Sequence, residues 1–209
     1  PILALDYAPW SDATTPPTRT SFDGITVKNG DPGKRLIGIL RTTEPGTTTI
    51  DLGGVIAGSG SSDYPKIYLA NLYNLYDTRA TYFFADSWDS LNNAWGPPPS
   101  STYPFAPRIS WVQASSTLAT AFLDIYNNFA DGSSVAAIAY VAPGIDTTDA
   151  PPADAFFGEC QNNNTTAGSQ WCRSLSAGKH DIYYLYKQSQ SSASINQHPS
   201  HGMIVTVKV

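Results

Sequence analysis

Short runs of strand-forming residues, separated by dense turn signals, follow one another along almost the whole chain. The final run, over 203–209, shows the pattern clearly: Met203, Val205, Val207 and Val209 fall on one face, and polar residues interrupt the other. Such alternation with a period of two is typical of a strand with one buried face. About ten such runs at fairly regular spacing indicate a β-sandwich or jelly roll.

Composition agrees with a β fold. Charged residues make up only 14% of the 209 residues, and Val, Ile, Thr and aromatic residues are plentiful. Helix surfaces normally draw on Glu, Lys and Arg, whereas these β-branched and aromatic residues favour strands. Because surface charge keeps soluble proteins apart, so little of it is typical of a chain that packs against copies of itself.

Strand boundaries are expected where turn residues interrupt the apolar runs. The longest paired element should be a hairpin of strands 117–129 and 134–141, turning at Asp131-Gly132. Residues 143–152 and the segment from Gln161 to Trp171 are expected to be loops. Other strands are expected over 22–28, 36–41, 47–52, 67–76, 81–85, 108–112, 180–186 and 203–209. The pattern of 67–76 fits a helix about as well, and the all-β context favours the strand.

These elements predict an all-β protein, an antiparallel β-sandwich with jelly-roll-like order and long loops. Residues 22–209 are expected to form one domain, since no linker divides them. Residues 1–21 are expected to be an extended arm, because Pro9, Pro16 and Pro17 prevent regular structure. The arm's apolar side chains are candidates for contact with a neighbouring subunit: Ile2, Leu3, Leu5, Tyr7 and Trp10.

The charge pattern disfavours two classes of partner. The formal net charge is -5 and no basic run occurs, so nucleic-acid binding is not expected. No apolar run reaches the roughly 18 residues that a membrane helix needs. The N-terminus lacks the basic start and apolar stretch of a signal peptide. We therefore expect synthesis in the cytoplasm, without contact with a membrane.

The two cysteines, Cys160 and Cys172, flank the Asn- and Thr-rich segment between them. A disulfide closing a loop of this size would contribute about 3 kcal/mol in the chain-entropy model. Two free thiols, as in a reducing cytoplasm, are the alternative. The sequence leaves both states open.

Catalytic and metal-binding patterns are weak. No Gly-x-Ser-x-Gly motif occurs, and the pair His198 and His201, with His180 elsewhere, lacks the further ligands of a zinc site. Several aspartates could in principle pair as in a glycosidase, but their Gly, Pro, Thr and Ser neighbours favour turns: Asp86, Asp89, Asp124, Asp146, Asp149 and Asp154. We expect no enzyme activity, no cofactor and no metal.

The aromatic residues are numerous, with five Trp, twelve Tyr and eight Phe. Most are expected to pack in the core and across strands. The alternative is a surface that binds sugar or protein, because Tyr and Trp anchor interfaces. Tyr103, within the proline-rich stretch 97–107, is the candidate exposed aromatic.

A series of short motifs, in the same order along the chain, resembles a module found at the C-terminal end of tailed-bacteriophage tail-fibre and related virion proteins. They are Trp10-Ser11-Asp12, Gly24-Ile25-Thr26-Val27-Lys28-Asn29-Gly30, Arg35-Leu36-Ile37-Gly38-Ile39-Leu40-Arg41-Thr42-Thr43, Leu72-Tyr73-Asn74-Leu75-Tyr76-Asp77-Thr78-Arg79, Ser87-Trp88 with Trp95, and Gly178-Lys179-His180-Asp181-Ile182-Tyr183-Tyr184-Leu185. The proline-rich stretch 97–107 departs from that pattern.

The resemblance implies a β-sandwich virion module that is usually oligomeric and often has no known enzymatic role. Because only about twenty arm residues precede the module, a capsid decoration (cement) protein is expected, most simply a homotrimer that binds the major capsid protein. The alternative is a fibre tip or adhesin that binds host surface glycan, and a polysaccharide depolymerase is a third hypothesis.

Overall fold

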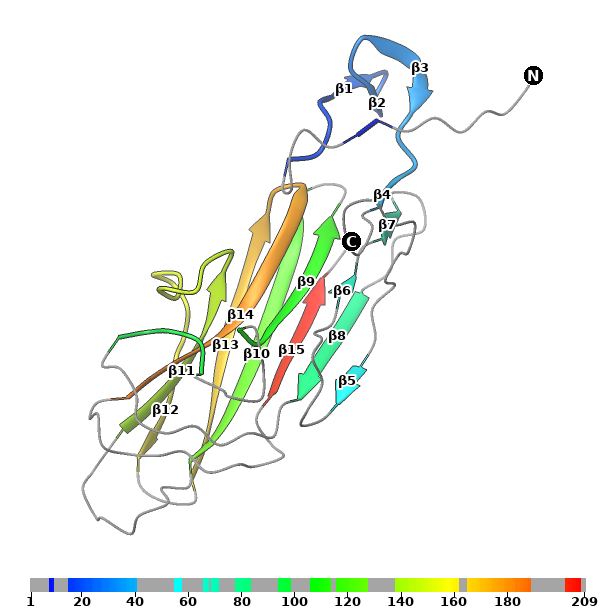
Figure 1. Ribbon diagram of the computed structural model, residues 1–209. Coiled ribbons are helices and arrows are strands. Elements are labelled where there is room, and N and C mark those ends of the chain that lie inside the picture. The colour runs from blue at the N-terminus through cyan, green and yellow to red at the C-terminus, as the bar shows by residue number, and fades with distance from the viewer. Residues whose placement is uncertain are drawn as a thin grey trace.

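The structure, a computed structural model, describes a chain of strands and turns with no helix in the described residues (Figure 1). The described residues are 8–9, 15–40, 55–57, 66–67, 69–71, 78–83, 94–98, 106–113, 116–127, 138–161, 165–188 and 202–207.

Two five-stranded sheets form the body of the molecule. The first, here the β10 sheet, has the order β13 (Thr165–Leu175), β10 (Thr117–Asn127), β15 (Gly202–Val207), β8 (Thr78–Phe83) and β5 (Val55–Ala57). The second, here the β14 sheet, has the order β12 (Gly158–Gln161), β11 (Ile138–Ile145), β14 (Gly178–Gln188), β9 (Arg108–Gln113) and β6 (Lys66–Ile67). Neighbouring strands are antiparallel, except that the short edge strands β5 and β6 pair in parallel with β8 and β9.

The connections between these strands follow the jelly-roll order. Taken along the chain, β8 to β15 read as one long antiparallel hairpin that pairs β11 with β12, β10 with β13, β9 with β14, and β8 with β15. The hairpin is wrapped so that alternate pairs lie in opposite sheets. This arrangement produces two facing four-stranded sheets, as in a jelly roll. The predicted all-β, jelly-roll-like sandwich is confirmed.

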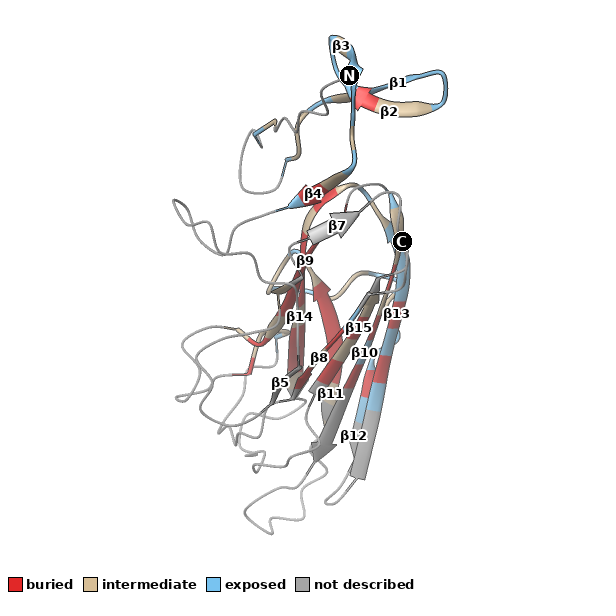
Figure 2. Cartoon of the chain, turned by 90° about the vertical axis from the view of Figure 1, so that its right-hand side faces the viewer, coloured by how far each residue is buried: buried red, intermediate tan, exposed pale blue. Residues whose placement is uncertain are grey.

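Alternating side chains of the two sheets fill the space between them. The largest completely buried side chains include Trp111, Tyr82 and Tyr184, and the cluster extends to Trp171 at the β13 edge. In β15, Met203 and Val205 are buried and the residues between them are more exposed, as the sequence pattern predicts. Figure 2 shows this alternation along β13 and β15.

The two sheets approach each other closely at their β12–β13 side. A Cβ atom on Gly158 would lie 2.7 Å from the carbonyl oxygen of Gly168, which is backbone and cannot move aside easily. Phe156, just before β12, exchanges two backbone hydrogen bonds with Gln170 of β13. The edge of the sandwich is therefore closed here by the residues that lead into β12.

A smaller three-stranded sheet precedes the sandwich and lies beyond one end of it (Figure 1). It consists of β1 (Arg19–Phe22), β2 (Ile25–Lys28) and β3 (Asp31–Arg35). Between it and the sandwich, β4 (Gly38–Leu40) pairs with β7 (Leu69–Asn71), and both contact β9.

Several local expectations need correction. The expected single strand 22–28 is a hairpin, because Asp23 and Gly24 both have positive φ, at 50° and 76°, as a two-residue type I′ turn requires. Strands β10 and β11 do not form a hairpin: β10 pairs with β13 and β15, and β11 pairs with β12 and β14 in the opposite sheet.

Two segments that the sequence assigns to loops are partly strand, while residues 146–152 are a loop as expected. The stretch after Gln161 becomes β13 from Thr165 onward, with Ser169 and Trp171 facing inward, and β11 continues to Ile145. At the N-terminus, β1 begins at Arg19, within the segment expected to be an extended arm.

Candidate functional site

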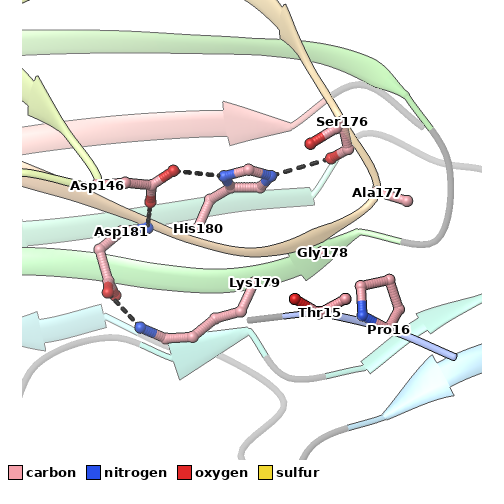
Figure 3. A pocket seen from close by; sticks show the side chains of 9 residues that line it. All are labelled: Thr15, Pro16, Asp146, Ser176, Ala177, Gly178, Lys179, His180 and Asp181. Carbon is pink, nitrogen blue, oxygen red and sulfur yellow. Dashed lines mark hydrogen bonds and ion pairs between the residues drawn. The ribbon is translucent and has the colours of Figure 1, made fainter. Parts of the chain in front are cut away.

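A polar cavity of about 440 Å³ lies at one end of the sandwich (Figure 3). Thr15 and Pro16 form one wall, and residues 176–181 form the opposite wall as the chain turns from β13 into β14. Asp146 joins them from the end of β11. Three parts of the chain that lie far apart in sequence thus meet here.

Asp146 connects the end of β11 to β14. Its φ of 55° reverses the chain after Ile145, a conformation that Asp tolerates better than most residues. Its backbone N–H donates to the carbonyl of Asp181 at 2.9 Å, and its Oδ1 accepts the backbone N–H of Asp181 at 2.7 Å. The carboxylate therefore continues the hydrogen-bond ladder beyond the last residue pair of β11 and β14.

His180 lies beside Asp146, almost entirely buried, with its ring 5.5 Å from that of Trp111. Its Nδ1 is 2.8 Å from Oδ2 of Asp146, and its Nε2 is 2.9 Å from the carbonyl oxygen of Ser176. Carboxylate and carbonyl oxygens both accept hydrogen bonds, so this geometry favours a ring that carries a proton on each nitrogen, an imidazolium ion.

The pKa of His180 is raised above its usual value. Burial is the largest single influence and acts to lower this pKa. The hydrogen bonds to Asp146 and Ser176, together with the negative charges of Asp146 and Asp181, outweigh burial. A protonated ring with both N–H groups in use has no lone pair with which to accept a proton from a substrate.

Asp181, the neighbouring carboxylate, is also fully engaged. It accepts a hydrogen bond from the hydroxyl of Ser110 and forms an ion pair with Lys179, whose side chain is 14% exposed. This ion pair lies on the outer side of the β14 sheet, opposite the core-facing His180. Asp146 therefore pairs with His180, and Asp181 pairs with Lys179, so the cluster contains two carboxylates and two basic groups in ion-pair contact.

Gln113 extends the network to the β13–β14 turn. Its amide donates to the carbonyls of Leu175 and Ser176, and its Oε1 accepts the indole N–H of Trp111 at 3.1 Å. Because His180 donates to the same Ser176 carbonyl, the turn is held from two strands at once. The arrangement holds the β13–β14 turn against β9 and β14, as a structural clamp does.

The outer face of the β10 sheet is a second candidate site, for binding rather than chemistry. One row of cross-strand neighbours runs over it from the β13 edge to β8: Phe156, Gln170, Phe122, Ile204 and Thr81. Phe156 is 79% exposed and Phe122 is 42% exposed.

The next row of cross-strand neighbours on the same face is Cys172, Thr120, Thr206 and Arg79. Among the described side chains of the two rows, Arg79 is the one that carries a charge. We call these two rows the open face.

The outer side of the β14 sheet is different. Side chains that alternate with the core residues, and so point away from the core, are nevertheless buried there: Ser110, Val112, Ala142, Asp181 and Leu185. One outer side of the sandwich is thus covered by the chain's own residues, whereas the open face remains exposed.

A third feature is an aromatic cluster of Trp95, Tyr140 and Phe157 beside Lys187. The three rings contact one another edge to face, with centroids 5.9 to 6.4 Å apart. The Lys187 ammonium lies 5.0 Å from the Tyr140 centroid and 5.2 Å from that of Trp95. Phe157 is 56% exposed. Gly96 pairs with Tyr186 and so fixes the segment that carries Trp95 beside β14.

The predicted site residues are only partly visible. The arm residues Ile2, Leu3, Leu5, Tyr7 and Trp10 lie outside the described residues, as do Tyr103, His198 and His201. Cys172 is a free, exposed thiol on the open face, and the Thr120 hydroxyl lies 3.5 Å from its sulfur. Cys160 belongs to β12 in the opposite sheet, and its side chain is not described, so the state of the Cys160–Cys172 pair stays a prediction.

The aspartates considered for glycosidase chemistry do not form a pair within the described residues. Asp146 binds His180, Asp149 lies in a turn with Thr147 and Thr148, and Asp154 forms an ion pair with Arg173. The Arg173 hydrogen bond lowers the pKa of Asp154. Asp86 and Asp89 lie outside the described residues, and the side chain of Asp124 is not described.

In the part of the chain that is described, no three His, Cys, Asp or Glu side chains converge in the way a metal site requires. The same part contains no helix of the length and hydropathy needed to cross a membrane.

Sequence reasoning missed the cluster around His180 and the open face. His180 and Asp146 are separated by 34 positions, and only the β11–β14 register brings them together. Phe122 lies within an alternating strand pattern as an apolar residue on the polar face. That irregularity is the signal that could have identified the open face.

Comparisons with known proteins give little more. No protein-family description matches the chain, and no curated protein matches it. Among solved structures, one titled "Structure of Eiger TNF from S. frugiperda" is similar at 11% identity and a TM-score of 0.32, covering 61% of this chain and 92% of that chain. A similarity this low carries no argument about function, and the jelly-roll assignment rests on the strand order above.

Proposed function

We propose that this chain is a structural protein of a bacteriophage virion, made in the host cytoplasm, that acts as a capsid decoration protein. In this proposal it acts as a homotrimer, binds the major capsid protein and performs no catalysis. The observation that carries the proposal is the open face: an exposed, almost uncharged sheet surface bearing Phe122 and Phe156. The resemblance of the sequence motifs to phage virion modules supports this class of particle.

The open face suits an apolar contact. Its two rows cover about 13 Å of strand length, and four strand spacings of about 4.8 Å give about 19 Å across the strands, for a surface of roughly 250 Å². A standard interface buries about 800 Å² on each partner, so the open face is one part of such a contact. Apolar surface contributes about 25 cal/mol per Å² when it is buried. Phe122 and Phe156 would therefore supply much of the binding free energy.

A binding experiment on heads that lack this protein tests the proposal. Wild-type chain should bind such heads to saturation, and the double variant Phe122→Ser with Phe156→Ser should bind at least tenfold more weakly. Phe22→Ser is the matched control, because Phe22 is 54% exposed but lies on the small sheet. Removing residues 1–10 should also weaken binding if the arm grips the shell.

Absence of binding by the wild-type chain would contradict the proposal. Equal binding by the double variant and the Phe22→Ser control would show that the open face is not the contact.

The aromatic cluster favours one alternative, a fibre-tip adhesin for host surface glycan. Trp95, Tyr140 and Phe157 form a partly exposed apolar platform, and Lys187 supplies a cation beside it. In that case Trp95→Ala should abolish retention of the chain on host polysaccharide, while the Phe122 and Phe156 variant should be retained normally. Loss of the polysaccharide itself during incubation would instead support a depolymerase.

A further inference from the structure

The polar cavity at the β13–β14 turn is large enough to hold a small molecule (Figure 3). Its volume of about 440 Å³ falls within the range of about 300 to 1,000 Å³ that is usual for sites of small ligands. The hydrogen bonds between His180, Asp146 and Ser176 explain how the turn is held. They do not explain an open space of this size beside the turn.

Three side chains that line the cavity can form further hydrogen bonds. The Asp146 carboxylate has about four lone-pair positions and uses two of them, for His180 and for the backbone N–H of Asp181. This side chain is 46% exposed, so the other positions are open to a ligand. The Lys179 ammonium has three donors, of which Asp181 takes one. The hydroxyl of the exposed Ser176 has no hydrogen bond to a described residue.

The paired charges of the cavity indicate which class of ligand it can take. An anion would meet the Asp146 carboxylate, and a cation would meet the Lys179 ammonium and the His180 ring. Either would compete with the existing ion pairs. A neutral hydroxyl group avoids this competition, because it can donate to Asp146 and accept from Lys179. Hydrogen bonds to charged groups are also stronger than those between neutral groups.

Apolar residues complete the lining of the cavity. Pro16 on one wall and Ala177 on the other are both partly exposed. A sugar ring has C–H groups on its faces and hydroxyl groups around its rim, so it can contact both kinds of residue at once. We propose that this cavity binds one unit of a neutral sugar. Asp146 accepts hydrogen bonds from the sugar hydroxyls, and Lys179 and Ser176 donate to them.

This site is separate from the surfaces considered above. The cavity includes the first residues of β14, whereas Lys187 of the aromatic cluster lies near the other end of that strand. Phe122 and Phe156 of the open face do not line the cavity. Because the proposal does not depend on a role in the capsid, the purified chain is sufficient to test it.

An NMR titration of the full chain with the neutral methyl glycosides of glucose, galactose and mannose tests the proposal. At least one glycoside should bind saturably in the millimolar range and shift the backbone amides of Asp146 and residues 176–181. Glucuronate and glycine are the charged probes, and each should bind at least tenfold more weakly than that glycoside.

Variants at the β13–β14 turn locate the binding. Ala177→Trp places a large side chain in the cavity and changes no hydrogen-bonding side chain, so it should abolish the amide shifts. Ser176→Ala removes one donor and should weaken binding about threefold to tenfold. Ser174→Ala is the matched control, because Ser174 is exposed but does not line the cavity, and it should bind like the wild type. Trp95→Ala should also bind like the wild type, which separates this site from the aromatic cluster.

The absence of saturable binding by all of these glycosides overturns the proposal. Amide shifts that are unchanged in a folded Ala177→Trp variant also overturn it, because the sugar would then bind elsewhere. Equal affinities of the Ser176→Ala and Ser174→Ala variants contradict it even if Ala177→Trp does not fold. Tighter binding of glucuronate or glycine would assign the cavity to a charged ligand. None of these results bears on the binding of the open face to heads, so the two proposals fail separately.

Discussion

At the scale of single residues, His180 shows how this fold stabilises a buried charged side chain. A buried imidazolium is costly unless it is paired. Here the Asp146 carboxylate and the Ser176 carbonyl each accept a hydrogen bond from one ring nitrogen of His180. Asp146 also accepts the backbone N–H of Asp181 in β14. The residue that most resembles a catalytic group is thus one whose hydrogen-bonding capacity is fully used.

The raised pKa of His180 predicts how stability depends on pH. The folded chain holds this proton more tightly than the unfolded chain, so the stabilisation is complete below the ordinary pKa of 6.5 and is lost as pH rises through the folded-state pKa. The other histidines and the two cysteines also titrate near this range, so the difference between the wild type and a His180 variant is what reports on His180.

Urea unfolding from pH 6 to pH 9 measures this effect. The variant His180→Gln should be less stable than the wild type by about 1–3 kcal/mol at pH 6, from loss of a charge-assisted hydrogen bond. The difference should shrink as pH rises. A difference that is constant or grows with pH would show that His180 is neutral in the folded chain.

Glycine positions offer a second prediction at this scale. Gly158→Ala should destabilise the chain by about 1–3 kcal/mol through overpacking, because the new Cβ would lie 2.7 Å from the Gly168 carbonyl oxygen. Gly96→Ala is the matched control, since no atom lies within 4 Å of the position that its Cβ would take, and it should change stability by at most about 0.5 kcal/mol. Equal melting temperatures for the two variants would contradict the close approach of β12 and β13.

At the scale of elements, the Asp23-Gly24 turn determines the small sheet. Gly24 has a φ of 76°, so Gly24→Ala should weaken the β1–β2 hairpin by about 1 kcal/mol. Amide hydrogen exchange should then accelerate in β1 and β2 and remain unchanged in β10 and β14. Gly33→Ala, at a position without a positive φ, should leave exchange in the hairpin unchanged. Unaltered protection in the Gly24 variant would exclude the type I′ turn.

Element-level prediction from this sequence is correct for several strands, such as β9, β14 and β15, and wrong for the partners of β10 and β11. The strand expected over 47–52 lies outside the described residues. Alternation identifies the buried face of β15 because burial acts on each residue locally. The Asp131-Gly132 turn residues predict that β10 and β11 form a hairpin. Both strands have an apolar inward face, and such a face can pack in either sheet of the sandwich. Which sheet a strand joins depends on long-range pairs such as β10 with β13, and no local pattern records them.

The same dependence on long-range strand pairing decides which features of the candidate sites the sequence could predict. The type I′ turn at Asp23-Gly24 could have been predicted, because the Asp-Gly dipeptide is a strong hairpin signal by itself. The clamp of His180 and Asp146 could not, since it exists only after the jelly roll has aligned β11 with β14. Asp146 alone has the sequence context of an ordinary turn residue.

At the scale of the whole molecule, the surface is divided by character. The outer side of the β14 sheet is covered by the chain itself, the open face of the β10 sheet is exposed and nearly uncharged, and the small sheet carries the excess positive charge. A jelly roll supports many unrelated functions, so the fold alone assigns none. The distribution of apolar and charged surface is what favours a protein that works by contact with neighbours.

If this chain coats a virion shell, as we propose, its copy number on purified particles must match that role. Quantitative mass spectrometry, calibrated against the major capsid protein, gives this number. A decoration protein should be present in hundreds of copies at a fixed ratio to the capsid protein. A handful of copies, or none, would contradict the claim.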